Sequence, residues 1–400
     1  MRIVLGVGAG IAAYKACELL RLFTEAGHSV RVAPTPDALN FVGAATWAAL
    51  SGQPVTATAW DDVHEVPHVR IGQQADLVMV APATADLMAR AAAGMSGDLL
   101  TAVLLTARCP VVFAPAMHTE MWEHPATRAN VATLRGRGAI VLDPASGRLT
   151  GADTGPGRLP EPASLFAAAL RAAARGSAGL TPDLAGRQVL ISAGGTREDI
   201  DPVRYLGNRS SGRQGYALAS TAASRGARVT LVAANTELPD PAGVLVIRVG
   251  SARELREQVL AEAKAADCVV MAAAVADFRP ASRSEAKIKK TGAPPAPIAL
   301  VKNPDVLREL ADTRPRPGQV IVGFGAETGD LLANGRAKLA AKGCDLLVVN
   351  QVGPGLAFGT SDNEAVVLSP DGPEVKVPRG PKEALADVVW DLVAARLDPG

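Results

Sequence analysis

The chain has 400 residues, of which 48 % are hydrophobic and 20 % charged, and its formal net charge at pH 7 is +1. This length suits two domains, because single hydrophobic cores stop growing at about 250–300 residues. With a net charge so close to zero, the protein as a whole does not attract nucleic acid or an anionic membrane. Any anion site must therefore come from a local arrangement of residues.

The four cysteines lie far apart and form no CxxC pair, which argues against a disulfide framework or a zinc site and fits a reducing cytoplasm. The apolar stretch Ile3–Ala13 is interrupted by glycines and runs directly into a helical pattern. We therefore interpret it as a buried strand and turn rather than a signal peptide. No run of about 20 apolar residues occurs, and no membrane span is expected.

Short apolar runs alternate with helical stretches in the first half of the chain. A helix is predicted over Ile11–Ala26, and Gly27 closes it. Strands that are apolar throughout and alternate with helices indicate a parallel sheet covered on both faces. The strands of this half are predicted at Arg2–Val7, Ser29–Ala33, Leu77–Ala81, Val111–Ala114 and Ala139–Leu142.

The alternation lapses around Arg171–Leu184, a stretch rich in Ala, Gly and Arg that indicates a linker. We predict two domains, 1–178 and 179–400. The strands of the second are expected at Gln188–Ala193, Arg228–Ala233, Val244–Val249, Cys268–Ala273, Val320–Gly323 and Asp345–Val349. Its helices are expected at Arg213–Arg225, Ala252–Ala265, Asp330–Lys342 and Pro381–Leu397. The predicted fold is α/β, with two Rossmann-like domains that each have a mostly parallel sheet and helices on both faces.

A long polar segment without a clear period lies between Asp277 and Val301. Loops of this length are uncommon in compact domains and are often functional lids. Its basic residues are Arg279, Arg283, Lys287, Lys289 and Lys290.

Open parallel sheets bind ligands at the carboxyl ends of their strands. Gly8-Ala9-Gly10 follows the first strand there and opens a helix, an arrangement that admits a phosphate; a tight turn without a ligand is the alternative. The glycine spacing does not match GxGxxG, which disfavours an NAD-linked dehydrogenase. Three further strand ends carry a small residue, a proline and a hydroxyl or imidazole, in Ala33–Thr35, Ala81–Asp86 and Ala114–His118.

The phrases LGVGAGIAAYK, APATAD, AAGMSGDLLT and PAMHTEMW resemble the homo-oligomeric flavin-containing cysteine decarboxylases. The resemblance implies a catalytic histidine shortly before the third strand, and His68 stands there. An imidazole can take a proton near neutral pH, although a surface or helix-capping role is the alternative. The resemblance also implies that FMN lies at the rim of the sheet. Its neighbours there would be Gly8, Gly10, Thr35, Thr84, Ser96 and Asp98.

Two positions depart from that family. His118 stands where the family has an asparagine that orients the substrate carboxylate, and Gly151 stands where a cysteine on a mobile flap donates a proton. In the family, the substrate is oxidised by the flavin and loses CO2, and the resulting ene-thiol is protonated and reduced. The front half is therefore expected to be a decarboxylase; the alternatives are an oxidative decarboxylase that releases the ene-thiol, or a non-catalytic flavin-binding module.

In the second half, the strand Val189–Ala193 runs into GGTRE and then into a polar stretch that opens a helix. Asn208, Ser210 and Ser211 there either cap the helix or bind a phosphate or carboxylate. Lys338 and Lys342 are four residues apart and share one helix face. That face is either solvated or, together with the lysine-rich segment, a triphosphate clamp.

This half resembles phosphopantothenate–cysteine ligase through the phrases AGGTREDIDPVRYLGNRSSG, AAAVADFRP, KIKK, VKNPD, VGFGAET and SDNEAVVL. In bacterial members of that family the nucleotide is CTP. The resemblance implies that CTP is held by Met271, Ala272, Ala273, Asp277, Lys287, Asn303, Pro304, Asp305, Val306, Phe324, Lys338 and Lys342.

The same resemblance implies roles for individual residues. Asp277 would read the cytosine edge or help bind Mg2+ on the triphosphate. Lys287 would promote formation of the acyl-cytidylate, and Arg204 and Asn208 would serve the second step, in which the cysteine amine displaces CMP.

Together, the two resemblances predict a cytoplasmic fusion of two enzymes of coenzyme A synthesis. It would join 4′-phosphopantothenate to cysteine and decarboxylate the product to 4′-phosphopantetheine. Its partners are small molecules, with neither nucleic acid nor membrane. Flavin sites between the subunits of trimers, joined through ligase dimers, would make a homo-dodecamer by symmetry.

Overall fold

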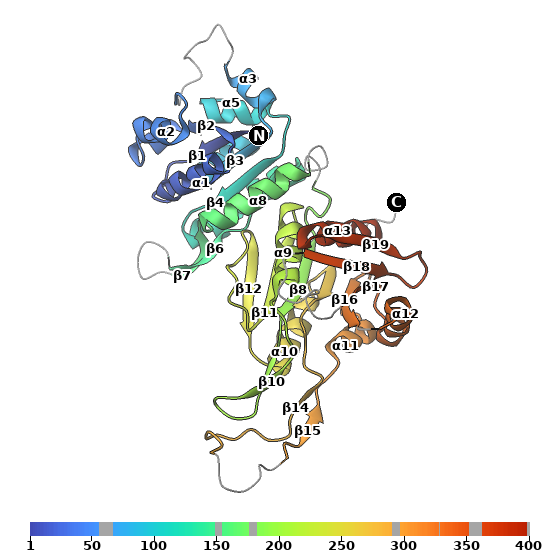
Figure 1. Ribbon diagram of the computed structural model, residues 1–400. Coiled ribbons are helices and arrows are strands. Elements are labelled where there is room, and N and C mark those ends of the chain that lie inside the picture. The colour runs from blue at the N-terminus through green and yellow to red at the C-terminus, as the bar shows by residue number, and fades with distance from the viewer. Residues whose placement is uncertain are drawn as a thin grey trace. The chain divides into compact units, whose positions relative to one another are not determined.

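The computed structural model in Figure 1 describes residues 1–55, 67–148, 154–175, 182–289, 297–327, 329–351 and 362–397. These residues divide into two compact units; Met1–Gly186 forms most of the first and Val246–Gly400 most of the second. The predicted boundary between residues 178 and 179 lies outside the described residues and stays a prediction. None of the described helices is long and apolar enough to cross a membrane.

The first unit is built on a five-stranded sheet with the order β2-β1-β3-β4-β5. All its neighbouring strands are parallel, as predicted. The chain places β2 on one side of β1 and β3 on the other, so the direction of winding reverses at β1 and ligands are expected at that switch point. The strands are β1 (Arg2–Val7), β2 (Ser29–Pro34), β3 (Leu77–Ala83), β4 (Val111–Pro115) and β5 (Ile140–Val141).

Helices cover both faces of this sheet because successive residues of each strand point to opposite sides. Leu5 and Val7 of β1 share one core with helices α1, α2 and α8. Val4 of β1 belongs to the other core, with helices α3, α4, α5 and α7. These helices are α1 (Ala13–Glu25), α2 (Ala44–Ser51), α3 (Pro67–Gln74), α4 (Ala85–Ala92), α5 (Leu99–Thr106), α7 (Pro125–Gly136) and α8 (Pro162–Ala174).

The second unit contains an eight-stranded sheet with the order β12-β11-β8-β13-β16-β17-β18-β19. The central run from β8 to β17 is parallel, whereas β18 and β19 extend it antiparallel. Neither of these two strands was predicted, and β19 forms the edge of the sheet. The strands are β8 (Gln188–Gly194), β11 (Arg228–Ala234), β12 (Val244–Val249), β13 (Cys268–Met271), β16 (Val320–Glu327), β17 (Leu346–Gln351), β18 (Asp362–Leu368) and β19 (Val375–Pro381).

Two groups of helices cover the second sheet. Helices α10 (Ala252–Ala263), α11 (Val306–Thr313) and α12 (Leu331–Lys342) share one core with alternate residues of the central strands. Helices α9 (Arg213–Ser224) and α13 (Lys382–Leu397) lie outside that core and cover the opposite face. The buried indole of Trp390 on α13 donates a hydrogen bond to the carbonyl of Leu218 on α9, at 3.0 Å. The predicted α/β architecture is thereby confirmed.

Two short antiparallel ribbons extend from the second sheet (Figure 1). One pairs β9 (Arg197–Asp199) with β10 (Tyr205–Gly207). The other pairs β14 (Phe278–Pro280) with β15 (Leu300–Lys302) and joins the two ends of the polar segment that was predicted to be a loop. That prediction was wrong at the segment's ends, because strands of three residues are too short to show a period in the sequence.

Candidate functional site

The carboxyl edge of the first sheet brings Gly8 against β3. The Gly8 N–H donates a hydrogen bond to the carbonyl of Pro82 at 2.9 Å, and a Cβ on Gly8 would stand 2.6 Å from that oxygen. Gly10 differs, because a Cβ there would have the methyl of Thr84, at 3.9 Å, as its nearest neighbour. Only glycine fits at Gly8, and the backbone at Gly10 has space in front of it for a ligand.

Two predicted flavin neighbours begin helical turns at this edge. The Thr35 hydroxyl accepts a hydrogen bond from the backbone N–H of Ala38, and the Thr84 hydroxyl accepts one from Leu87, each at 3.3 Å. These bonds cap η1 (Pro36–Asn40) and α4. Each hydroxyl still has its own proton to donate, and helix N-termini favour anions. The edge therefore suits a phosphate-bearing ligand such as FMN.

Asp98 precedes α5 and is held from two sides. Its Oδ1 accepts a hydrogen bond from the Thr101 N–H at 2.8 Å, and its Oδ2 accepts one from Arg90 at 2.6 Å, with the side chain only 3 % exposed. Leu100, in the first turn of α5, lies against β1, where a Cβ on Gly6 would be 2.5 Å from its side chain. Asp98 therefore lies near the same edge, while Ser96 is exposed in the turn before it.

His68 lies on α3, away from this group. Its carbonyl accepts a hydrogen bond from the Thr106 hydroxyl at 2.9 Å, and its Nδ1 is buried without a hydrogen-bond partner among the described residues. Thr106 ends α5, whereas Asp98 precedes the first of its eight residues. Eight residues of α-helix span about 12 Å. The contacts within one chain therefore do not bring His68 to Asp98.

His118 is exposed immediately before α6 (Thr119–Glu123). A hairpin of β6 (Ala145–Arg148) and β7 (Thr154–Arg158) lies against both of its neighbours. The Met117 N–H donates a hydrogen bond to the Gly157 carbonyl at 3.0 Å, and the Thr119 hydroxyl donates one to Pro156 at 2.9 Å. The arms of the predicted flap are thus docked beside His118, and its tip with Gly151 lies outside the described residues.

In the second unit, the end of β8 is joined to the chain that leaves β13. The Ala274 N–H donates a hydrogen bond to Gly194 at 2.8 Å, and the Ala276 N–H donates one to the Thr196 hydroxyl at 2.9 Å. A Cβ on Gly195 would stand 2.7 Å from the Asn208 carbonyl. Three segments therefore meet at this edge with no room for a side chain at Gly195.

Asn208 does not cap a helix. Its side-chain amide donates a hydrogen bond to the carbonyl of Val275 at 3.0 Å. Asn303 makes the next link, because its side chain donates to Ala276 and its backbone N–H donates to Asp277, each at 2.8 Å. The predicted nucleotide-binding residues of the β13 and α11 regions are thus connected.

The two predicted clamp lysines on α12 reach this edge, and each faces a carboxylate. Lys338 pairs with Glu327 at 3.1 Å, and Lys342 pairs with Asp305, whose other oxygen caps α11. Phe324, three residues before Glu327 on β16, is half-buried. Glu327 was not predicted, because a single carboxylate at a strand end carries no pattern.

Lys287 is exposed in the basic segment. Its neighbour Ile288 accepts a hydrogen bond through its carbonyl from Arg204 at 2.8 Å. Arg204 also pairs with Asp201, a buried carboxylate that was not predicted, and its guanidinium holds the pKa of that carboxyl well below the usual range. Arg204, which is predicted for the second step, is therefore bonded to the residue that follows Lys287, which is predicted for the first.

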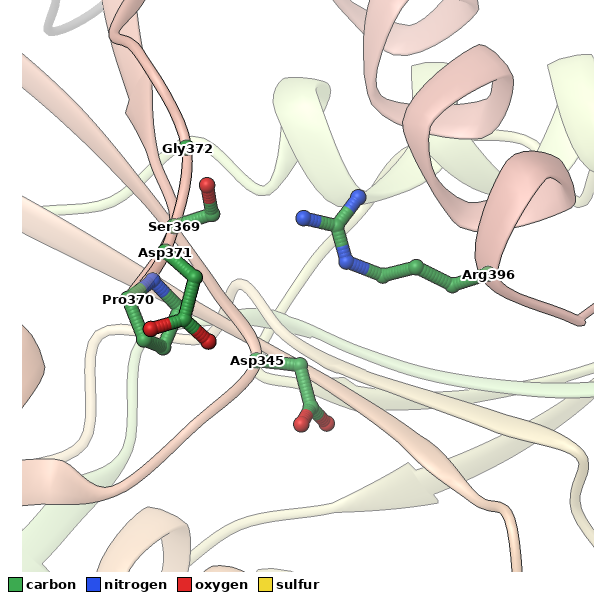
Figure 2. A pocket seen from close by; sticks show the side chains of 6 residues that line it. All are labelled: Asp345, Ser369, Pro370, Asp371, Gly372 and Arg396. Atoms are coloured by element: carbon green, nitrogen blue, oxygen red, sulfur yellow. The ribbon is translucent and has the colours of Figure 1, made fainter. Parts of the chain in front are cut away.

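Elsewhere in the second unit, a small polar pocket lies at the amino end of β17, on the opposite edge of the sheet from these residues. Figure 2 shows Arg396 reaching from the end of α13 toward the turn at Ser369. Asp345 in its wall is already paired with Arg314 at 2.9 Å.

The described residues also contain no group of three or more His, Cys, Asp or Glu side chains that could hold a metal ion.

Comparisons with known proteins match both units. The flavoprotein family model matches residues 1–172, and the model of the DNA/pantothenate metabolism flavoprotein C-terminal domain matches residues 184–397. The coenzyme A biosynthesis bifunctional protein CoaBC of Mycolicibacterium smegmatis is 60 % identical over 99 % of this chain and 98 % of its own length. That of Vibrio cholerae is 42 % identical over 98 % and 97 %.

Among solved structures, the C-terminal domain of a CoaBC protein is 32 % identical and covers 55 % of this chain and 100 % of its own, with a TM-score of 0.47. The assignment of the chain to a family rests on the full-length relatives and on the two family models. The chain belongs to the family of bifunctional coenzyme A biosynthesis proteins, with a flavoprotein region followed by a pantothenate-metabolism C-terminal domain.

Proposed function

We propose that the chain catalyses two successive reactions of coenzyme A synthesis. The second unit joins 4′-phosphopantothenate to cysteine with CTP, and the first unit decarboxylates the product to 4′-phosphopantetheine with FMN. One observation carries this proposal. Both halves of the chain, 99 % of its length, match a bifunctional coenzyme A biosynthesis protein. The reaction sequence is consistent with a cytoplasmic enzyme that acts on small molecules.

In the ligase reaction, the substrate carboxylate attacks the α-phosphorus of CTP, and pyrophosphate leaves. Lys287 stabilises the charge that develops in this step. The cysteine amine then attacks the acyl carbon of the acyl-cytidylate and releases CMP, with Arg204 and Asn208 orienting the reactants. The two segments that carry these residues are hydrogen-bonded to the β13 edge and to the basic segment, which supports a shared site.

We assign nucleotide binding to the carboxyl edge of β13 and β16. Lys338 and Lys342 bind the triphosphate there and exchange Glu327 and Asp305 for phosphate oxygens, while Asp277 contacts the cytosine or the metal. Mg2+ arrives with the triphosphate, because this ion usually binds through one or two carboxylates and substrate phosphates. Met271–Ala273, Asn303–Val306 and Phe324 complete this assignment.

In the decarboxylase reaction, FMN supplies the electron acceptor for oxidation of the substrate. Gly8, Gly10, Thr35, Thr84, Ser96 and Asp98 would hold it. The residues present fit that cofactor, since the backbone at Gly10 is open and two capped helix starts face the same edge. His68 takes a proton from the substrate, and His118 donates a hydrogen bond to the substrate carboxylate. The Nδ1 of His68, which has no hydrogen-bond partner in the part of the chain that the structure describes, and the separation of His68 from Asp98 support a site completed by a second copy of the chain.

We also propose a homo-oligomer in which trimers of the first unit are joined through dimers of the second, giving a dodecamer. Exposed apolar side chains gather on the two ribbons of the second unit, which supports contact with another copy. They include Tyr205, Phe278, Ile298 and Leu300, each between 45 and 51 % exposed. Mass measurement of the purified assembly tests the subunit number.

The experiment that tests the function supplies 4′-phosphopantothenate, cysteine and CTP to the purified protein and identifies the products by mass. CMP, pyrophosphate and 4′-phosphopantetheine are expected. Failure to form phosphopantothenoylcysteine would contradict the ligase. A second candidate, an oxidative decarboxylase, is favoured by Gly151 in place of the family's cysteine. A single equivalent of ene-thiol per flavin would identify it, and unchanged CO2 release on replacing His68 would point to a base other than His68.

A further inference from the structure

Asp201 lies in the turn between β9 and β10 with its side chain 0 % exposed. Its Oδ1 accepts hydrogen bonds from the backbone N–H groups of Val203 and Arg204, each at 2.8 Å. Aspartate commonly closes turns in this way. This oxygen therefore has a local structural role, and the other oxygen has different partners.

The second oxygen, Oδ2, joins two segments that are distant in sequence. It accepts hydrogen bonds from Nε of Arg204 at 3.0 Å and from the backbone N–H of Ile288 at 3.1 Å. Arg204 donates to the carbonyl of the same Ile288 at 2.8 Å. One ion pair thus holds both the N–H and the C=O of Ile288, and hydrogen bonds to charged groups are about twice as strong as neutral ones.

Ile288 lies between Lys287 and Lys289, so this ion pair fixes the backbone that carries the predicted catalytic lysine. The same carboxylate fixes the guanidinium of Arg204, which is assigned to the second step. We propose that Asp201 is a positioning residue of the ligase: it holds Arg204 and, through the Ile288 peptide, Lys287 in one arrangement that serves both steps. We call the bonds from Asp201 and Arg204 to the Ile288 peptide the anchor. The catalytic roles in this inference rest on the proposed ligase function, whereas the anchor is independent of it.

A neighbouring ion pair offers a matched control. Asp199 pairs with Arg283 of the same basic segment at 3.0 Å, but the side chains are 44 % and 61 % exposed. Exposed ion pairs contribute little, because solvent and salt screen them. Asp199→Asn therefore removes a carboxylate that faces the same segment without touching the Ile288 peptide.

Asp201→Asn is the main variant. It keeps the shape of the side chain and one oxygen for the turn, but it puts an N–H donor where Ile288 and Arg204 need an acceptor. We expect kcat for ligation to fall about 10- to 100-fold, as loss of hydrogen bonds to a charged group implies. KM for CTP should change little, Asp201→Glu should recover part of the rate, and Asp199→Asn should stay close to wild type.

Single-turnover reactions of the full-length protein separate the two steps. Acyl-cytidylate formation is measured without cysteine, and its consumption is measured after cysteine is added. Both rates should fall in Asp201→Asn, since both residues lose one support. A loss confined to one step, an equal loss in Asp199→Asn, or an unchanged kcat with only a lower melting temperature would overturn the proposal.

Trypsin tests the anchor without any ligase activity. Cleavage of the Lys287–Ile288 bond should be slow in wild type, because its N–H is the one bound by Asp201, and at least about tenfold faster in Asp201→Asn. Cleavage after Arg283 is the internal reference, since the Ser284 N–H is bound to the Ile200 carbonyl at 2.9 Å. Failure of the wild-type protein to ligate would contradict the proposed function. Equal protection of the Lys287–Ile288 bond in Asp201→Asn would contradict the anchor.

Discussion

The two units place their candidate sites at the same position of similar sheets, the carboxyl edge, but they assemble them differently. In the second unit, contacts within one chain join Asn208 to Val275 after β13, Lys342 to Asp305 before α11, and Arg204 to Ile288 of the basic segment. In the first unit, the rim at Gly8 and Asp98 is separated from His68 by the length of α5. The same architecture therefore supports one site that a single chain connects and one whose predicted groups stay apart.

The largest expected effect comes from His68→Asn. Removing a general base should lower CO2 release about 10²- to 10⁴-fold while ligation continues. Mixed assemblies of His68→Asn with Gly8→Val chains sharpen the comparison, because each chain supplies the group that the other lacks. Recovery of CO2 release in the mixture is expected for a site shared between copies. Absence of recovery, with both variants assembled, would place His68 in the site of its own chain.

Gly8→Ala should reduce flavin content strongly, because its Cβ would stand 2.6 Å from the backbone oxygen of Pro82, which cannot move aside easily. Overpacking of this kind costs about 1–3 kcal/mol. Gly136→Ala on α7 is the matched control, since a Cβ there would have nothing within 4 Å and Gly136 lies outside the proposed rim. Flavin absorbance per chain measures the effect. Equal flavin content in the two variants would contradict the proposed rim.

A smaller effect is expected at the lysines of α12. Lys338→Ala should raise KM for CTP about tenfold, the usual scale for a lost charged contact. Glu327→Gln should lower that KM by a small factor, because it removes the carboxylate that occupies Lys338 at 3.1 Å. Steady-state kinetics at varied CTP distinguish the two directions. A higher KM in both variants would mean that Glu327 positions the lysine rather than competing with the nucleotide.

The smallest effect is expected for the pH dependence of the bond between Asp201 and the Ile288 amide. The pKa of Asp201 is lowered by Arg204, so its stabilising contribution is fully present above the ordinary carboxyl pKa of about 3.9 and is lost only as pH falls through the lower folded value. Protection of the Ile288 amide should therefore stay constant between pH 5 and pH 8. Hydrogen exchange corrected for intrinsic rates measures it. A loss of protection near pH 6 would assign the anchor to another group.

Much of the fold followed from the sequence. The predicted strands of both halves are present with ends that differ by a few residues, because buried parallel strands are continuous apolar runs. The antiparallel strands β18 and β19 at one end of the second sheet were not predicted. The three-residue strands of the ribbons were not predicted either, since they offer no period and gain their stability from pairing with each other.

The candidate sites followed less completely. Family phrases indicated Asn208, Lys287 and Lys338, but the carboxylates that hold neighbouring groups, Asp201 and Glu327, were not predicted. Their role depends on partners far away in sequence, such as Ile288. The separation of His68 from Asp98 was also hidden, because sequence order does not reveal which end of α5 each residue meets. The predicted family itself is confirmed by the comparisons.

The pairing of Lys338 with Glu327 and of Lys342 with Asp305 also bears on ligand choice. Without nucleotide, the two cations are already neutralised within the protein. A ligand with a single charge would gain little by displacing one carboxylate, whereas a triphosphate bound as proposed would meet both lysines at once with several charges. In the proposed function, the two ion pairs would therefore act as a threshold. They would leave a monophosphate such as CMP weakly held, and so would favour binding of CTP and release of CMP.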